Sequence, residues 1–187
     1  ICAISVDFNE RKGYIKLVNM FNKLIKIDNN FKLNIIAVKS DLSDKQKVEL
    51  NNEIIKLNLS DFVTITQRIQ LEDKDKERNE IANILQKNDI ILSYSDDESF
   101  HYSFAEGMLS GLEGFYNMWQ NSKIKEFWNS WGYNSEDDFI AGIIFWSKLS
   151  NEEKINKAIL NRNYVVNNFG SVIIAKKYEE LFFGNIN

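Results

Sequence analysis

Two glutamates, Glu98 and Glu106, lie eight positions apart where an apolar run leads into a segment of helical character. The run Asp89–Tyr94 is short, apolar and rich in β-forming residues, so it predicts a buried strand, and Ser95–Asp97 predicts the loop that leaves it. In open α/β sheets ligands collect at the carboxyl ends of the strands, and the following helix directs free backbone N–H groups at them. The pattern therefore favours a binding site for an anion such as phosphate.

The two glutamates lie in different sequence contexts. Glu98 belongs to the polar segment Ser95–Glu98, and a polar loop of this kind is usually just solvated. Glu106 lies in an otherwise apolar helical segment beside Phe104, where burial of an unpaired carboxylate would cost several kcal/mol. We therefore expect Glu106 to have a hydrogen-bond donor, and a sugar with vicinal hydroxyls offers two of them.

A second group of polar residues, Asn9–Gly13, follows the first apolar run of the chain. Gly13 permits a tight turn with close backbone approach, and Arg11 and Lys12 could neutralise a diphosphate. A basic pair before a helix is also a common surface feature. Because this segment and Glu98 follow strands that end at the same edge of the predicted sheet, we expect the two loops to form one site.

The elements that must position these residues alternate between strand-like runs and segments of helical period. This alternation is typical of a parallel sheet covered by helices, so we predict one α/β domain over residues 1–187. The predicted strands are Ile1–Val6, Leu33–Val38, Phe62–Thr66, Asp89–Tyr94 and Gly114–Asn117. The predicted helices are Lys16–Ile27, Ser43–Leu57, Lys74–Gln86 and Ser103–Leu109, two that begin at Ser135 and Ser150, and a last one at Val172–Phe183.

Length and composition limit the classes of protein to consider. With 187 residues, 44% of them hydrophobic, the chain can form one core but not two ordinary ones. A net charge of -4 and a pI near 5.2 argue against a nucleic-acid-coating surface, and no segment approaches the roughly 20 apolar residues of a membrane span. The single cysteine, Cys2, cannot form an internal disulfide, and we expect a cytoplasmic location. The chain opens directly on a predicted strand at Ile1, so we expect it to be a piece of a longer protein.

At this point the residues resemble a known family. The tripeptide Arg11–Gly13 after a first strand, and Glu98-x7-Glu106-Gly-Met-x-x-Gly111 after a later one, are similar to the donor half of retaining GT-B glycosyltransferases. The resemblance covers most of the chain and implies a Rossmann-like domain, one half of a GT-B fold, with helices on both faces of the sheet and a helical C-terminal layer. It also implies that Glu98 meets the donor sugar, Glu106 holds the ribose and Lys12 pairs with the leaving diphosphate.

The resemblance implies a wider site and a reaction. The predicted contacts to a nucleotide-diphosphate sugar come from Arg11, Lys12, Gly13, Glu98, Ser99, Phe100, His101 and Glu106. The reaction would transfer the sugar to a hydroxyl of a glycan or lipid-linked acceptor with retention of configuration, and we expect no metal or other cofactor. The acceptor domain would lie N-terminal to this chain, so the chain alone should bind nucleotide but not complete transfer. Bacterial surface polysaccharide or glycoconjugate synthesis, in the cytoplasm or at the inner face of the plasma membrane, is the expected setting.

The chain departs from the family pattern in three places. No arginine occurs at Ser5–Phe8, where many relatives have one near the end of the first strand. His101 replaces a glycine that is common in the family, and its ring either approaches the phosphates or sugar, or caps the motif helix or packs against Tyr102. The segment Gly111–Gly114 lacks the proline that relatives often have. The first departure puts donor affinity in question.

Two other classes of protein compete with this interpretation. A non-catalytic binding or interaction domain with the same fold would be consistent with the missing arginine and with exposed tryptophans. The tryptophans are Trp119, Trp128, Trp131 and Trp146. A nicotinamide dehydrogenase is disfavoured because no Gly-x-Gly-x-x-Gly follows the first strand.

Overall fold

A six-stranded sheet forms the centre of the molecule, and every neighbouring pair of its strands is parallel. The computed structural model describes residues 1–5, 10–37, 44–67, 73–96, 98, 100–117 and 128–183. The strands are β1 (Cys2–Ser5), β2 (Leu33–Ala37), β3 (Val63–Gln67), β4 (Ile90–Ser93), β5 (Glu113–Asn117) and β6 (Gly132–Tyr133). Their order across the sheet is β3-β2-β1-β4-β5-β6. The predicted parallel sheet is confirmed. Strand β6 was not predicted, because a two-residue strand is too short to show a hydrophobic period in the sequence.

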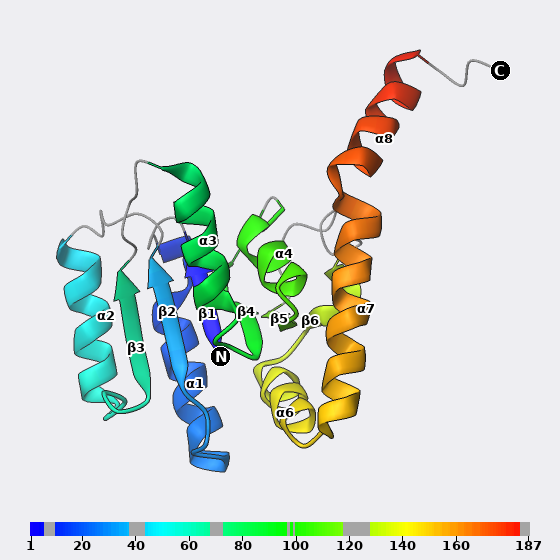
Figure 1. The fold of residues 1–187 in the computed structure, drawn as a ribbon. Helices are drawn as coiled ribbons and strands as arrows, with labels where there is room; N and C mark the ends of the chain where they lie inside the picture. Colours follow the sequence, from blue (N-terminus) through cyan, green and yellow to red (C-terminus); the bar gives the residue numbers. More distant parts are fainter. Residues whose placement is uncertain are drawn as a thin grey trace.

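Helices cover both faces of this sheet (Figure 1). The described helices are α1 (Tyr14–Ile27), α2 (Asp44–Lys56), α3 (Lys74–Leu85), α4 (Tyr102–Leu109), α6 (Glu136–Ser147), α7 (Asn151–Phe169) and α8 (Ser171–Phe183), with 3₁₀ turns η1 (Glu10–Lys12) and η2 (Asn129–Trp131). The predicted helix starts at Ser135 and Ser150 are confirmed, since each side chain accepts a hydrogen bond from a backbone N–H of the first turn. The predicted helix start at Ser43 falls outside the described residues.

Successive side chains along each strand point to opposite faces of the sheet, and this divides the core into two layers. One layer lies between the sheet and α1, α2 and α6, and it takes Ala3 from β1 with Ile90 and Leu92 from β4. The other lies under α3, α4 and α7, and it takes Cys2 with Ile91. Neighbouring residues of one strand therefore enter opposite layers, as the period of two in a strand requires.

The C-terminal helices form the predicted helical layer, but the last helix is not buried. Helix α8 continues from the end of α7 and extends away from the sheet (Figure 1). Val172 is 78% exposed and Tyr178 is 57% exposed, so these two residues of α8 lie largely in solvent. The prediction of the helix is confirmed.

No helix in the described part of the chain combines the length and the apolar character needed to cross a bilayer.

Candidate functional site

The site begins where β1 and β4 lie side by side and their carboxyl ends meet. The turn after β1 runs through η1 to Gly13, whose φ is 65°. A Cβ at this position would lie 2.2 Å from the backbone oxygen of Tyr94, which follows β4. The N–H of Asp96 donates to the backbone oxygen of Arg11 at 2.8 Å, so the two loops are joined through their backbones. The expected close approach at Gly13 is confirmed.

An ion pair joins the same two loops through their side chains. Lys12 Nζ lies 2.7 Å from Glu98 Oε1, and the two side chains are only 15% and 6% exposed. The Ser95 hydroxyl donates to the same carboxylate oxygen at 2.7 Å. The interpretation of Glu98 as a solvated loop residue is therefore wrong, because Glu98 is buried and held by two donors.

The surroundings of Glu98 keep it ionised. Burial by itself would raise the pKa of this carboxyl, but the His101 ring, the Lys12 ammonium and the Ser95 hydroxyl together lower the pKa below its usual range. Among the described contacts of Glu98, all three of these groups face Oε1. The second oxygen, Oε2, therefore remains for a further hydrogen-bond donor.

His101 caps the motif helix. Its backbone lies in the left-handed region at φ 58°, and its Nδ1 accepts a hydrogen bond from the N–H of Phe104 at 3.2 Å. The capping alternative is thus confirmed, although the neighbouring ring is that of Phe104, with centroids 5.8 Å apart, rather than that of Tyr102. Burial lowers the pKa of His101 to about 4, so the ring is neutral at pH 7. Because Nδ1 is the acceptor, the proton lies on Nε2, which is 3.7 Å from Glu98 Oε1.

The start of α4 has two backbone donors that no described residue accepts from. The N–H groups of Phe104 and Ala105 bond to the His101 oxygen, whereas those of Tyr102 and Ser103 bond to no described residue. Free N–H groups and the positive end of the helix dipole favour negative charge here. Helix α4 also lies close on the sheet, since a Cβ at Gly107 would come within 2.8 Å of Ile91. This packing fixes the direction in which the N–H groups point.

Glu106 differs from its predicted environment. We expected a carboxylate that burial forces to find a donor, but the Glu106 residue is exposed on α4. The cause is its position on the helix, since Phe104, Ala105 and Met108 point into the core and leave Glu106 on the outer side. Desolvation therefore does not explain this glutamate, and a ligand role must rest on its place on the exposed side of α4.

The remaining predicted contacts lie around these groups. Arg11 is exposed next to Lys12 in η1. Phe100 is half-buried, with ring centroids 4.8 Å from Phe169 and 5.7 Å from Trp128. The prediction for Ser99 concerns a residue outside the described part of the chain. The structure therefore brings Lys12, Glu98 and His101 together beside Gly13, whereas Phe100 packs against core aromatic rings and Glu106 lies on the outer side of α4.

One tryptophan that supported the rival interaction domain is not at the surface. Trp128 is fully buried between aromatic rings, and Trp131 is half-buried 6.1 Å from it, centroid to centroid. Trp146 is also only partly exposed, and Trp119 lies outside the described residues. Trp128 therefore provides no exposed contact surface, because it forms part of the core beneath α4 and α7.

Sequence reasoning missed a buried polar cluster at the opposite end of the sheet. Asn161 on α7 donates to Glu113 Oε2 at 2.9 Å and accepts from the Trp131 indole N–H at 3.2 Å. Lys157 Nζ lies 3.8 Å from Glu113 Oε1. Burial raises the pKa of Glu113, although Lys157 and Asn161 act against the shift. The cluster ties α7 to β5, and no local pattern could reveal it because its members are far apart in the chain.

Comparison with known proteins identifies relatives of the fold. No protein-family model and no curated protein matches this chain. A glycosyltransferase from Rickettsia africae matches with a TM-score of 0.74 and 19% identity, over 96% of this chain and 46% of that protein. The C-terminal domain of a glycosyl transferase group 1 family protein from Francisella tularensis matches with a TM-score of 0.70 and 15% identity, over 91% of this chain and 86% of that domain.

A third solved structure, S. aureus TarM in a complex that includes UDP, matches with a TM-score of 0.76 and 18% identity, over 97% of this chain and 35% of that protein. The chain thus spans less than half of the Rickettsia protein and of TarM. The parallel sheet with helices on both faces is the fold of one Rossmann-like half of a GT-B glycosyltransferase, as the sequence predicted.

Proposed function

We propose that this chain is the donor-binding half of a retaining glycosyltransferase and that it binds a nucleotide-diphosphate sugar at the carboxyl ends of β1 and β4. One observation carries the proposal. Lys12 and Glu98, from loops far apart in sequence, form an ion pair at the edge of the sheet where ligands of open α/β folds bind. The fold shared with glycosyltransferases, one of them in a complex containing UDP, supports this ligand class.

In this proposal each group has a distinct task. Glu98 meets the donor sugar through its second oxygen, Glu106 holds the ribose, and Lys12 pairs with the diphosphate. The N–H groups of Tyr102 and Ser103 add hydrogen bonds to the phosphate oxygens. Arg11, Gly13, Phe100 and His101 are assigned further contacts to the donor, and the contact of Ser99 stays a prediction. No metal is required, because the cation and the helix terminus supply the positive charge.

Catalysis would follow from the charge that develops on the leaving diphosphate. As the sugar–oxygen bond breaks, negative charge grows on the phosphate oxygens, and the Lys12 ammonium can turn from Glu98 toward them. Fixed donors stabilise this charge more in the transition state than in the ground state, which lowers the barrier. The pair with Glu98 keeps the lysine at the site until the donor arrives.

The acceptor half is assigned to a separate N-terminal domain, consistent with a chain that spans less than half of the Rickettsia glycosyltransferase and of TarM. Helix α8 extends from the body and exposes Val172 and Tyr178, which such a domain could cover (Figure 1). We expect the chain alone to bind nucleotide without completing transfer to a glycan or lipid-linked acceptor. Bacterial surface polysaccharide or glycoconjugate synthesis, in the cytoplasm or at the inner membrane face, is the proposed setting.

A non-catalytic domain of the same fold is the second candidate, and one observation favours it. Lys12 is already neutralised by Glu98, and the N–H of Phe104 is already capped by the His101 ring. Both groups would otherwise serve an anionic ligand. This candidate predicts that nucleoside diphosphates do not bind.

Calorimetric titration with UDP, GDP and ADP tests the proposal. We expect one nucleotide to bind, with affinity falling about tenfold or more in Lys12→Ala, since a charge-assisted hydrogen bond is lost. Glu106→Ala should also weaken binding because the ribose loses its acceptor. Lys16→Ala is the matched control, since Lys16 lies on the neighbouring helix and pairs with exposed Asp96. Absence of binding, or equal losses in Lys12→Ala and Lys16→Ala, would reject the donor site.

A further inference from the structure

Strand β3 lies at an edge of the sheet. It is the terminal strand in the sheet order, and within the described ranges only β2 pairs with it. Its sequence, Val63-Thr-Ile-Thr-Gln67, contains β-branched residues but no charge and no proline. Proteins usually protect edge strands with Lys, Pro or a bulge, because unpaired backbone groups attract another strand. A regular, neutral edge strand therefore indicates a surface for strand addition.

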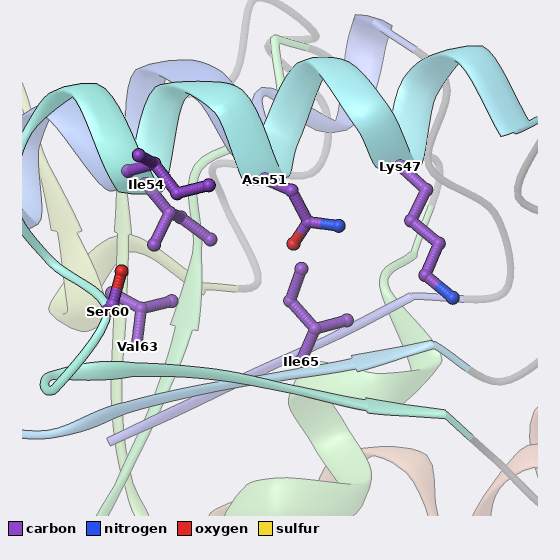
Figure 2. Close-up of a pocket in the computed structure, with 7 residues that line it drawn as sticks. Lys47, Asn51, Ile54, Ser60, Val63 and Ile65 are labelled. Carbon is purple, nitrogen blue, oxygen red and sulfur yellow. The ribbon is translucent and has the colours of Figure 1, made fainter.

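An apolar groove of about 710 Å³ lies beside this edge, between α2 and β3 (Figure 2). It is lined by Lys47, Asn51, Ile54, Ile55, Ser60, Val63 and Ile65. On the outer surface of α2, Ile55 is 63% exposed and Val48 is 54% exposed. Aliphatic side chains thus continue from the groove onto the helix surface, as in sites that bind another protein.

The hydrogen-bond phase of β3 determines which backbone groups point outward. The N–H of Leu33 on β2 donates to the oxygen of Phe62 at 2.9 Å. In a parallel ladder alternate residues face the same neighbour, so Thr64 and Thr66 face β2 while Ile65 and Gln67 face the free edge. The N–H of Val63 is already bonded to Leu59, which leaves its oxygen as an acceptor on the outer side.

We propose that a second copy of this chain adds to the edge, with the two β3 strands antiparallel about a two-fold axis at Ile65. The outward groups match in this register. Ile65 of each copy exchanges both backbone bonds with Ile65 of the other, and each Gln67 N–H donates to the Val63 oxygen across the axis. The two Ile65 side chains then meet over the joined grooves, and Thr64 faces Thr66. A two-fold interface requires such a self-complementary surface.

Charge also favours a second copy. Lys47 lies toward the carboxyl end of β3 and Ser60 toward its amino end (Figure 2). A two-fold axis at Ile65 brings the Lys47 end of one groove beside the Ser60 end of the other, where Asp61 is exposed. Neither the Lys47 ammonium nor the Asp61 carboxylate has an ion-pair partner in the described part of the chain. The two-fold arrangement would place these opposite charges at the same end of the interface.

This interface would leave the other surfaces open. Strand β3 and α2 lie at the opposite side of the molecule from α7 and α8 (Figure 1). The candidate donor site lies at the carboxyl ends of β1 and β4, away from the outer side of β3. Dimer formation is therefore compatible with nucleotide binding and with a partner domain on α8, and it does not depend on either.

Sedimentation velocity over a concentration series of the 187-residue chain tests the proposal. We expect a concentration-dependent dimer whose dissociation constant rises at least about tenfold in Ile65→Lys and in Ile55→Lys. Ile55 is exposed, so its substitution should leave the fold intact, as a thermal melt will show. Val172→Lys, an aliphatic-to-lysine change at another exposed position, on α8, should leave the dimer unchanged. The proposal would be overturned by a wild-type chain that stays monomeric. It would also be overturned if both edge variants formed a dimer as stable as that of the wild type.

Two further measurements test the register. Amide exchange at Ile65 and Gln67 should slow as protein concentration rises, whereas exchange at Thr64 and Thr66 should not change because those amides already bond to β2. Lys47→Asp and Asp61→Lys should each weaken the dimer several-fold, and their combination should restore it. Uniform protection of all four amides, or no recovery in the double variant, would rule out the two-fold arrangement about Ile65.

Discussion

Lys12 and Glu98 are 86 positions apart in the chain, and their side chains meet at 2.7 Å where the loops after β1 and β4 converge. Both side chains are largely withdrawn from water, so this pair differs from the exposed pairs on the helices. The pair links the structure of the loops to their proposed use, since the same lysine would hold a diphosphate. Its contribution to stability can be measured separately from ligand binding.

Removing the lysine should destabilise the fold. Lys12→Ala leaves the buried Glu98 carboxylate with the Ser95 hydroxyl and no cation, and breaking a buried pair costs on the order of 2–4 kcal/mol. Lys16→Ala removes an exposed pair and should cost less than about 1 kcal/mol. Urea denaturation measures both. Adding Glu98→Gln to Lys12→Ala should recover part of the lost stability. Equal losses in Lys12→Ala and Lys16→Ala would show that the Lys12–Glu98 pair contributes no more than an exposed ion pair.

Gly13 should tolerate no side chain. In Gly13→Ala the new Cβ meets the Tyr94 oxygen, built at 2.2 Å, and the residue must also keep a φ of 65°, so we expect a loss of about 3 kcal/mol or more. Gly111→Ala is the control, because its φ is 90° but the nearest atom is Ala158 Cβ at 3.9 Å. This variant should be destabilised only by the cost of placing alanine in the left-handed backbone conformation, about 1–2 kcal/mol. Thermal melts of both variants distinguish destabilisation by a steric clash from destabilisation by the left-handed backbone conformation alone.

His101 should make stability fall as the pH is lowered from about 6.5 toward 4. Burial lowers the pKa of His101 to about 4 in the folded state, so the unfolded chain binds the proton first, and acid favours unfolding. Full stability is present above about pH 6.5, and the loss reaches about 3 kcal/mol once the buried ring must be charged. Unfolding free energies measured at several pH values check this window.

His101→Gly is the comparison for the pH series, since glycine accepts the left-handed backbone and removes the ring. The variant should lose the His101 contribution to the pH dependence between about 6.5 and 4, while Glu113, whose pKa is raised by burial, acts alike in both proteins. Because His101 is the only histidine, its ring signals in NMR report its protonation without overlap. A ring that titrates near its ordinary pKa would contradict the buried, capping position.

Asn161 should stabilise the fold through Glu113. Asn161→Ala removes the amide that donates to the buried carboxylate, at a cost of about 2–3 kcal/mol at pH 7. Burial raises the pKa of Glu113, so lowering the pH neutralises it earlier than an exposed glutamate, and the cost should shrink on acidification. Asn168→Ala, on the same helix, removes only a bond to the Tyr164 oxygen and should cost less. If the stability lost in Asn161→Ala does not change with pH, the loss does not come from the Glu113 carboxylate.

The sequence by itself determined the elements and their order. Apolar residues at period two and at helical period gave the strands and helices to within a few residues, because burial of one face imposes these periods locally. The cap at Ser150 and the turn at Gly13 were also readable, since each depends on a few neighbouring residues. The motif around Glu98 and Glu106 indicated the sheet edge that the structure then showed.

Only the tertiary structure decided what these residues contact. Strand β4 lies beside β1 although the two are far apart in the chain, and this adjacency buries Glu98 against Lys12 and Ser95. The same kind of long-range packing hid Trp128 in the core, left Glu106 outside and created the bonds of Asn161 to Glu113. A local pattern sets which face of an element is apolar, but burial and polar partners depend on which elements meet, and that is a property of the whole fold.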